Sequence, residues 1–365
     1  MKKRLYILAA LLPILAVMIA GSLALMHVVG ARAAATCLPT GYIDPAENIP
    51  LTAAVIATGN VTGTIDATGC DIGVYYGPHT NGAVKKADVF GATRYGIVNN
   101  GANVNITFSS VHDIGDKPFD GVQRGLAIYF SYDSGASGTI SENKVYAYQK
   151  NGITVDGSSN SAKIEHNTVL GQGTVNYIAQ NGIEVGFGSK VTVGSNNVSG
   201  NSYTGSGGAS SGGILVVGGS CYGGPLEIGT KVTENTLTGN DVGLFLSNLD
   251  TSSCVPTTIP TRLYISENVV RNDAVNNTSG YNPGGYQAGI SDQGDYDKIV
   301  NNRVCGIGYT AVPNPPPYLY MVDTTVTNNP ILKDNKSCKT NATVSSPTVT
   351  THVQGTAHKR ANFVK

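Results

Sequence analysis

Aliphatic and polar residues alternate in short runs through most of the chain, and one six-residue pattern recurs in these runs. It consists of an aliphatic residue, two variable residues, Asn, one variable residue, and Val or Leu. Its copies occupy residues 140–145, 164–169, 193–198, 232–237, 265–270 and 299–304. Their Asn residues follow one another at spacings of 24, 29, 39, 33 and 34 residues. Repeats of this length indicate a solenoid, in which each repeat forms one coil and insertions lie in loops.

A second pattern, Gly followed by an aliphatic residue, a variable residue and usually Val or another aliphatic residue, lies between these copies. It spans residues 125–128, 152–155, 182–185, 213–216, 243–246 and 289–292. Residues two apart on a strand point to the same side. We therefore expect Ile153 and Val155 to face the core and to stack on Ile183 and Val185 of the next coil. Each coil should carry at least two strands, and we expect three.

The Asn and Gly positions fit the bends between these strands. Asn tolerates the left-handed backbone conformation, and its side-chain amide bonds readily to neighbouring backbone groups. Stacked coils would therefore place the Asn residues in a ladder. Gly before each second strand is expected to form another tight corner at little steric cost.

The two patterns resemble the repeats of the right-handed parallel β-helix proteins of the pectate-lyase-like superfamily. The resemblance covers residues 125–306 and extends back to about residue 52. It implies an all-β fold, namely a single-stranded right-handed parallel β-helix (a solenoid) with an N-terminal cap. The superfamily includes lyases, hydrolases, epimerases, phage tail proteins and surface proteins without known activity, so the fold does not select a function.

Composition supports the all-β class and an exported protein. The chain has 46 Gly and only 13% charged residues, which suits short strands joined by tight turns. Residues 1–35 combine a basic start, an apolar run and an Ala-x-Ala site, which is typical of a signal peptide; an uncleaved anchor is the alternative. We expect residues 36–340 to form the β-helix domain, including its cap, and residues 341–365 to form a flexible polar tail.

Charge narrows the choice of partners. Residues 36–365 contain 20 basic and 24 acidic residues, so no nucleic-acid partner is expected. The sequence predicts a secreted or cell-surface monomer that contacts a polysaccharide or a cell-surface glycan. Membrane association is expected only if the N-terminal segment stays uncleaved.

The six cysteines all follow the expected signal peptide, where an oxidising compartment favours disulfides. Taken in order, they form three pairs with equal separations of 33 residues, about one long coil. Other connectivities stay open, and metal binding is the weaker alternative because the chain has no Cys-x-x-Cys motif. The preferred pairs are Cys37 with Cys70, Cys221 with Cys254, and Cys305 with Cys338.

The catalytic motifs of hydrolases from this superfamily, including a Gly-His-Gly and an Arg-x-Lys segment, do not occur in the chain. A lyase that acts on uronic acids needs less, namely a cation to neutralise the sugar carboxylate and a base to remove the adjacent proton. Outward positions beside the second pattern could supply such groups if the coils stack in register. They are Arg124, Tyr129, Lys150, Asp156 and Glu184.

We assign hypothetical roles to these five residues. Lys150 or Arg124 would be the catalytic base, and Tyr129, Asp156 and Glu184 would bind substrate. Asp156 and Glu184 could also hold Ca²⁺, the one candidate cofactor. An exposed sheet also carries charged residues that have no function. The sequence thus predicts an exported protein that binds or degrades a polysaccharide, with lyase-like chemistry if it is an enzyme; the alternative is a noncatalytic surface or adhesion module.

Overall fold

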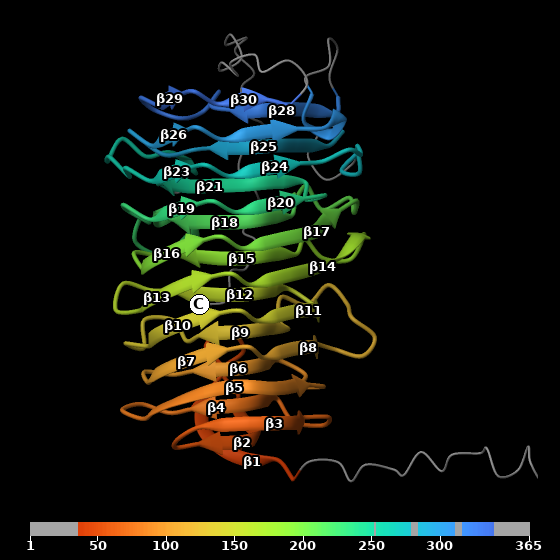
Figure 1. Ribbon diagram of the computed structural model, residues 1–365, viewed down its shortest axis with the longest axis vertical. Helices are drawn as coiled ribbons and strands as arrows, with labels where there is room; N and C mark the ends of the chain where they lie inside the picture. Colours follow the sequence, from red (N-terminus) through yellow and green to blue (C-terminus); the bar gives the residue numbers. More distant parts are fainter. Residues whose placement is uncertain (1–35, 252, 279–283, 311–315, 339–365) are drawn as a thin grey trace, which may run out of the picture. The chain divides into compact units, whose positions relative to one another are not determined.

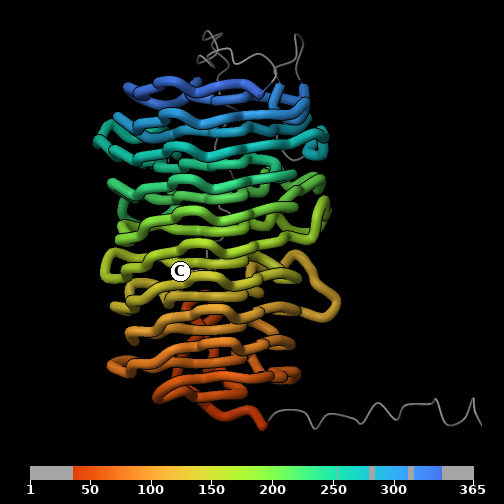
Figure 2. Tube along the Cα trace, in the orientation of Figure 1, coloured from red at the N-terminus to blue at the C-terminus, as the bar shows by residue number. Residues whose placement is uncertain are grey.

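The computed structural model describes residues 36–251, 253–278, 284–310 and 316–338. The predicted signal peptide over residues 1–35 and the predicted tail over residues 341–365 lie outside the described residues. The described chain winds into coils that stack on one another (Figures 1 and 2). Nearly all neighbouring strands are parallel, and the fold is the right-handed parallel β-helix that the repeats predict.

One strand of each coil contributes to a 12-stranded sheet, in which strands from successive coils pair side by side. Its two antiparallel pairs, β1 with β2 and β21 with β22, are the exceptions to the parallel order. The strands are β1 (Leu38–Ile43), β2 (Pro50–Ala57), β4 (Ile72–Tyr76), β6 (Tyr95–Asn99), β9 (Leu126–Phe130), β12 (Asn151–Asp156), β15 (Asn181–Gly186), β18 (Gly212–Gly218), β21 (Val242–Asp250), β22 (Val255–Pro256), β25 (Tyr286–Asp292) and β28 (Tyr318–Asp323).

The other strands form an 18-stranded sheet, to which most coils contribute two strands separated by a bend. Two short 3-10 helices, Ser220–Tyr222 and Ile307–Tyr309, lie in loops. The strands are β3 (Val61–Asp66), β5 (Asn81–Phe90), β7 (Asn103–Thr107), β8 (Ser110–Ile114), β10 (Ser137–Ser141), β11 (Lys144–Tyr148), β13 (Ser161–Glu165), β14 (Thr168–Val175), β16 (Lys190–Gly194), β17 (Asn197–Tyr203), β19 (Lys231–Thr233), β20 (Thr236–Thr238), β23 (Tyr264–Ser266), β24 (Val269–Arg271), β26 (Lys298–Val300), β27 (Arg303–Cys305), β29 (Ile331–Lys333) and β30 (Lys336–Ser337).

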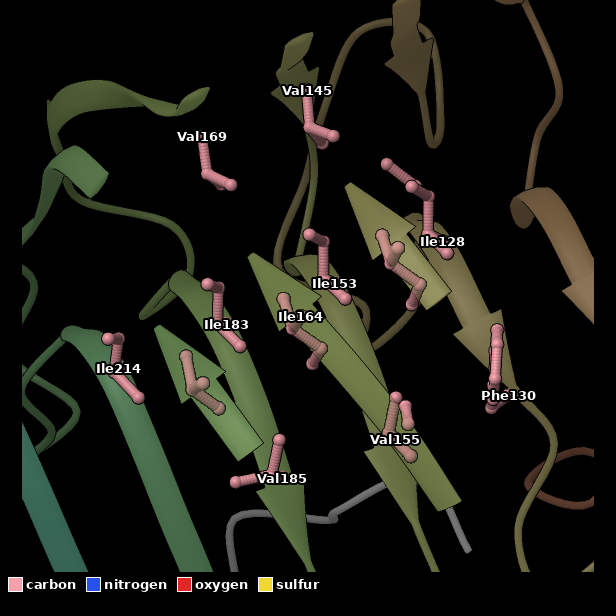
Figure 3. Packing of buried hydrophobic residues seen from close by; sticks show 14 of the residues in the cluster. Ile128, Phe130, Val145, Ile153, Val155, Ile164, Val169, Ile183, Val185 and Ile214 are labelled. Carbon is pink, nitrogen blue, oxygen red and sulfur yellow. The ribbon is translucent and has the colours of Figure 1, made fainter. Parts of the chain in front are cut away.

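The core runs along the inside of the coils and consists of stacked aliphatic side chains (Figure 3). Ile153 of β12 pairs in register with Ile183 of β15, and Val155 pairs with Val185. All four side chains are fully buried, which confirms the prediction from the second pattern. Burial of each such side chain contributes about 1.5–3 kcal/mol, so the stacking of coils is the main source of stability.

A ladder of Asn side chains fills the bend between the two strands that each coil gives to the 18-stranded sheet. In each step, Nδ2 of one Asn donates to Oδ1 of the next at 2.9–3.0 Å. A seventh Asn at the C-terminal end extends the six of the repeat. The ladder comprises Asn143, Asn167, Asn196, Asn235, Asn268, Asn302 and Asn335.

The backbone conformation at the Asn and Gly positions differs from the prediction in two ways. The left-handed conformation falls on the residue before each ladder Asn, for example His166 at φ 55° and Ser195 at φ 54°, and not on the Asn itself. Gly152 has no left-handed backbone either. A Cβ at this position would lie 2.5 Å from O of Gly182 and 2.6 Å from Cγ1 of Val169, so glycine is needed because adjacent coils approach closely.

N-terminal residues cover the outer face of the 12-stranded sheet over its first coils. Tyr42 packs with Tyr75, Tyr95 and Tyr129 in a second apolar cluster, separate from the inner core. The Tyr42 hydroxyl lies 2.7 Å from Oγ of Ser131. This part of the outer face is therefore built into the protein and is not an open surface.

Three disulfides join consecutive cysteines, as the equal spacing predicts. They link Cys37 with Cys70, Cys221 with Cys254, and Cys305 with Cys338. Disulfides are typical of extracellular compartments. Among the described residues, no helix has the length and the apolar character that a membrane crossing requires.

Candidate functional site

Two carboxyl side chains meet on the outer side of the 12-stranded sheet, where β12 pairs with β15. Glu184 lies between Ile183 and Val185, whose side chains face the core, so its own side chain points outward. Asp156 ends β12 and pairs in register with Gly186 of β15. We call Asp156 and Glu184 the acid pair; both belong to the set that the sequence singled out.

A hydrogen bond joins the two members of the acid pair. Asp156 is 1% exposed and Glu184 is 3% exposed. Burial raises the pKa of Asp156 well above its usual value, and the neighbouring Glu184 raises it further. Burial also raises the pKa of Glu184, but Lys150 and hydrogen bonds to its ionised form oppose that shift. The pKa shift is therefore larger for Asp156, which favours Asp156 as the member of the pair that keeps a proton.

Amide groups hold the Glu184 carboxylate in place. Its Oε2 accepts hydrogen bonds from Nδ2 of Asn151 at 2.9 Å and from Nδ2 of Asn181 at 3.1 Å. The two Asn residues are register partners in β12 and β15, and Nδ2 of Asn181 also lies 3.2 Å from Oδ1 of Asn151. Amide donors favour the ionised form of Glu184 and so partly offset the effect of burial on its pKa.

Lys150 lies beside the acid pair, directly before β12. Its Nζ donates to O of Ala179 at 2.8 Å, and the side chain is buried. Burial lowers the pKa of the Lys150 ammonium group, and the charge of Glu184 partly restores it. A desolvated lysine of this kind loses its proton more readily than a solvated one, which suits a base.

One oxygen of the acid pair is unsatisfied. Oδ1 of Asp156 is buried and has no hydrogen-bond partner among the described residues. Buried polar atoms almost always have partners, so such an atom suggests a position where a ligand group or water binds. The site thus combines two carboxyl groups, a desolvated amine and an unpaired acceptor. Like Tyr129, these groups are buried, so a substrate would reach them only if the side chains that cover them move.

Arg124 does not join this group. Its Nε and Nη2 donate to the Asp116 carboxylate at 2.7 and 2.8 Å, and its Nη1 donates to Oε1 of Glu47 at 3.1 Å. The bonds to Asp116 raise the pKa of Arg124 still further, so the guanidinium stays protonated. Its expected role as a base is therefore corrected: Arg124 holds a loop and an N-terminal segment together.

Tyr129 lies close to the acid pair but is fully buried. Its ring stacks on the Tyr95 ring with centroids 5.2 Å apart, and its hydroxyl accepts from N of Tyr132 at 3.0 Å. The expected stacking of a sugar on Tyr129 is corrected for this reason, because the ring has no exposed face. Covering by N-terminal residues such as Tyr42 is the physical cause.

The described residues contain no group of three or more His, Cys, Asp or Glu side chains that could hold a metal ion. Burial raises the pKa of both Asp156 and Glu184, which disfavours the doubly ionised pair that Ca²⁺ would bind. Binding of Ca²⁺ by these two residues stays a prediction.

Three further residues of the site are not among the sequence candidates. Asn151 and Asn181 precede the Gly of the second pattern in successive coils, and this shared position was the signal that could have identified them. Glu227 adds a third buried carboxyl group that acts on Asp156 through its charge, and burial raises its pKa to about 7. Glu227 lies in a loop outside both patterns, so the repeats give no sign of it.

Comparison with known proteins relates the chain to tailspike structures. No family model matches the chain. No curated protein matches it either. The Dettilon tailspike protein (gp208) has a TM-score of 0.50 and 13% identity, over 81% of this chain and 56% of that chain. A double-mutant tailspike protein of the E. coli bacteriophage HK620, in complex with a pentasaccharide, has a TM-score of 0.32 and 12% identity, over 79% of this chain and 53% of that chain.

This chain therefore spans little more than half the length of the tailspike chains that it matches. At such low identity the similarity concerns the fold. The predicted fold is confirmed: the chain is a right-handed parallel β-helix protein, and tailspike proteins have the same architecture.

Proposed function

We propose that this protein cleaves glycosidic bonds of an extracellular polysaccharide at the acid pair. The observation that carries the proposal is the buried, hydrogen-bonded contact between Asp156 and Glu184, in which burial raises both pKa values and raises that of Asp156 more strongly. Glycoside hydrolysis requires a protonated carboxyl group as acid and a carboxylate as base or nucleophile, held about 5–9.5 Å apart on either side of the bond that breaks. Asp156 and Glu184 are in direct hydrogen-bond contact, so the proposal requires that a bound substrate separates them. Groups with strongly perturbed pKa values that face one another are candidates for such roles.

Each proton of the reaction has a place in this arrangement. Asp156 would give its proton to the glycosidic oxygen as the bond to the sugar carbon breaks. Glu184 would take a proton from the attacking water, whose oxygen forms the new bond to the sugar. The hydrogen bond between the two carboxyl groups then offers a route for that proton back to Asp156, which would restore the starting state.

A uronate lyase is the second candidate, and Lys150 is the observation that favours it. Burial lowers the pKa of Lys150, so its neutral amine could remove the proton next to a sugar carboxylate. Asp156 would then protonate the leaving oxygen, and the product would be an unsaturated uronide. Both candidates need a polysaccharide as substrate, and the three disulfides support a site of action outside the cell.

One experiment separates the two chemistries. The purified full chain is incubated with a panel of neutral and uronic-acid polysaccharides, and reducing ends and the ultraviolet absorbance of unsaturated uronides are both measured. Hydrolysis produces reducing ends without the absorbance, and elimination produces both. We expect hydrolysis, and we expect Asp156→Asn and Glu184→Gln each to lower the rate about a thousandfold.

Asp273→Asn is the matched control, because the Asp273 carboxylate is 59% exposed and forms only a surface ion pair with Arg271. Its rate should stay unchanged. A rise in absorbance that Lys150→Ala abolishes would replace hydrolysis by the lyase reaction. Polysaccharide binding without any product would contradict both and leave a noncatalytic surface module.

A further inference from the structure

A cleft opens on the outside of the 18-stranded sheet, away from the acid pair. Its volume is about 410 Å³, within the range of small-molecule sites. Lys231 of β19, Tyr264 of β23 and Lys298 of β26 lie beside one another in register, one coil apart. Arg262 and Tyr296, from the turns before β23 and β26, complete its wall together with Gly229 and Ile331.

The lining of the cleft is cationic. Lys231, Arg262 and Lys298 contribute three positive charges, and no acidic residue lines the cleft. None of these three side chains forms an ion pair with another residue in the part of the chain that the structure describes. The whole chain has as many acidic as basic residues, 24 of each, so the positive charge of the cleft is a local excess.

The turns that carry two wall residues have a left-handed backbone, as do the bends before the ladder Asn residues. Arg262 has φ 50° and Tyr296 has φ 55°, the left-handed region that favours glycine. The equivalent turn of the preceding coil has Gly229 there, at φ 75°. The backbone N–H groups of these three residues make the same bond to the next coil, to O of Thr261, Asp295 and Asn328. The same turn thus places Arg262 and Tyr296 at equivalent positions of successive coils, on one side of the cleft.

The Asp297 carboxyl group is buried next to the cleft, close to the backbone of the residue after Arg262. Oδ1 of Asp297 accepts from N of Leu263 at 2.7 Å, directly after Arg262. Burial and the neighbouring Asp292 raise the pKa of Asp297 to about 8. The raised pKa favours the neutral form of Asp297, which reduces the negative charge behind the three cations.

The cleft also offers aromatic surface. The Tyr264 side chain is 37% exposed and lies between Lys231 and Lys298, about 4.8 Å from each along the stack of coils. Tyr296 is 46% exposed. Sugar rings pack against tyrosine faces, and carboxylates bind between cations. Cations and rings together match a sugar that carries a negative charge.

We propose that this cleft binds one uronate unit of an acidic polysaccharide, with its carboxylate among Lys231, Arg262 and Lys298 and its ring against Tyr264. The site lies on a different sheet from the acid pair and needs no turnover. A result that refutes uronate binding in the cleft can therefore be told apart from a result that refutes catalysis at the acid pair.

Titration calorimetry of the purified full chain with trigalacturonate tests the proposal, and the fully methyl-esterified trisaccharide is the uncharged probe. We expect binding of the acid and at least tenfold weaker binding of the ester. The double variant Lys231→Gln with Lys298→Gln should weaken binding of trigalacturonate at least tenfold, and Tyr264→Ala should weaken binding of the same ligand severalfold. All these side chains are exposed, so an unchanged thermal midpoint will show that the fold is intact.

Lys190→Gln is the matched control, because Lys190 is an exposed lysine of the same sheet outside the cleft. It should bind trigalacturonate like the parent protein. Equal weakening by Lys190→Gln and by the double variant would show general attraction of anions and would overturn the proposal. Equal binding of acid and ester would overturn it too, as would tighter binding of a single-stranded oligonucleotide of similar charge.

Discussion

Two buried polar regions run across neighbouring coils of this protein, and their hydrogen bonding differs. In the Asn ladder, each interior amide both donates to and accepts from its neighbours; Nδ2 of Asn196, for example, donates to Oδ1 of Asn235 and to backbone oxygens. In the acid pair, burial raises the pKa of both carboxyl groups, and Oδ1 of Asp156 has no partner among the described residues. The ladder is complete as it stands, whereas the acid pair is not.

This difference separates a structural role from a chemical one. A satisfied amide network fixes the register of the coils and offers nothing to a ligand. An unsatisfied buried carboxyl pair costs stability, and such a cost is typical of functional sites. Three exchanges between amide and acid test the contrast, and we order them by the size of the expected effect.

The largest effect is expected for Asn196→Asp in the ladder. The substitution replaces an amide donor that bonds to O of Ile164, O of Gly194 and Oδ1 of Asn235 by a carboxylate that repels these oxygens. We expect the free energy of unfolding in urea to fall by about 4 kcal/mol at neutral pH. Asn197→Asp, at an exposed position one residue later, should change it by less than about 0.5 kcal/mol. Equal effects would show that the ladder is not what holds this bend.

The next effect concerns the dependence of stability on pH. Glu227 is fully buried, and burial raises its pKa from 4.5 to about 7 in the folded protein. A proton held more tightly in the folded state stabilises the protein fully below the unfolded value, and this contribution is lost as the pH rises through the folded value.

We therefore expect the free energy of unfolding to fall by about 3 kcal/mol, through Glu227, as the pH rises from 4.5 to 8. Unfolding curves at a series of pH values should show this loss in the parent protein and a smaller one in Glu227→Gln. Identical slopes in the two proteins would refute the assignment of a raised pKa to Glu227.

The smallest effect on stability is expected for Asp156→Asn. The new amide can donate to the Glu184 carboxylate as the protonated acid does, so the free energy of unfolding should change by less than about 1 kcal/mol. The same substitution should nearly abolish polysaccharide cleavage. A loss of stability as large as that of Asn196→Asp would place the acid pair with the ladder, as a structural feature.

The repeats predict the fold because each copy acts locally. Ile153 and Val155 face the core, as their alternation indicates, and the Asn residues of six copies form the ladder. Equal spacing predicts the disulfides for the same reason, since one coil separates the members of each pair. Register also brings Asp156, Glu184 and Lys150 together.

Contacts between distant parts of the chain were not predictable from the repeats. Tyr129 is buried because Tyr42, far away in sequence, covers it. Arg124 pairs with Glu47, another N-terminal residue. The cationic cleft depends on left-handed turns at Arg262 and Tyr296. This backbone conformation favours glycine, so an arginine or a tyrosine in the sequence does not indicate such a turn.

The protonation state of Asp156 tests the central claim most directly. Isotope-edited infrared spectroscopy of labelled carboxyl groups, in the parent protein and in Asp156→Asn, measures it without any substrate. The account predicts a protonated C=O band at neutral pH that is absent in Asp156→Asn. Its presence would establish one shared proton in the acid pair. If Asp156 and Glu184 are both ionised at neutral pH, the pair has no acid to donate, and the proposed chemistry is wrong.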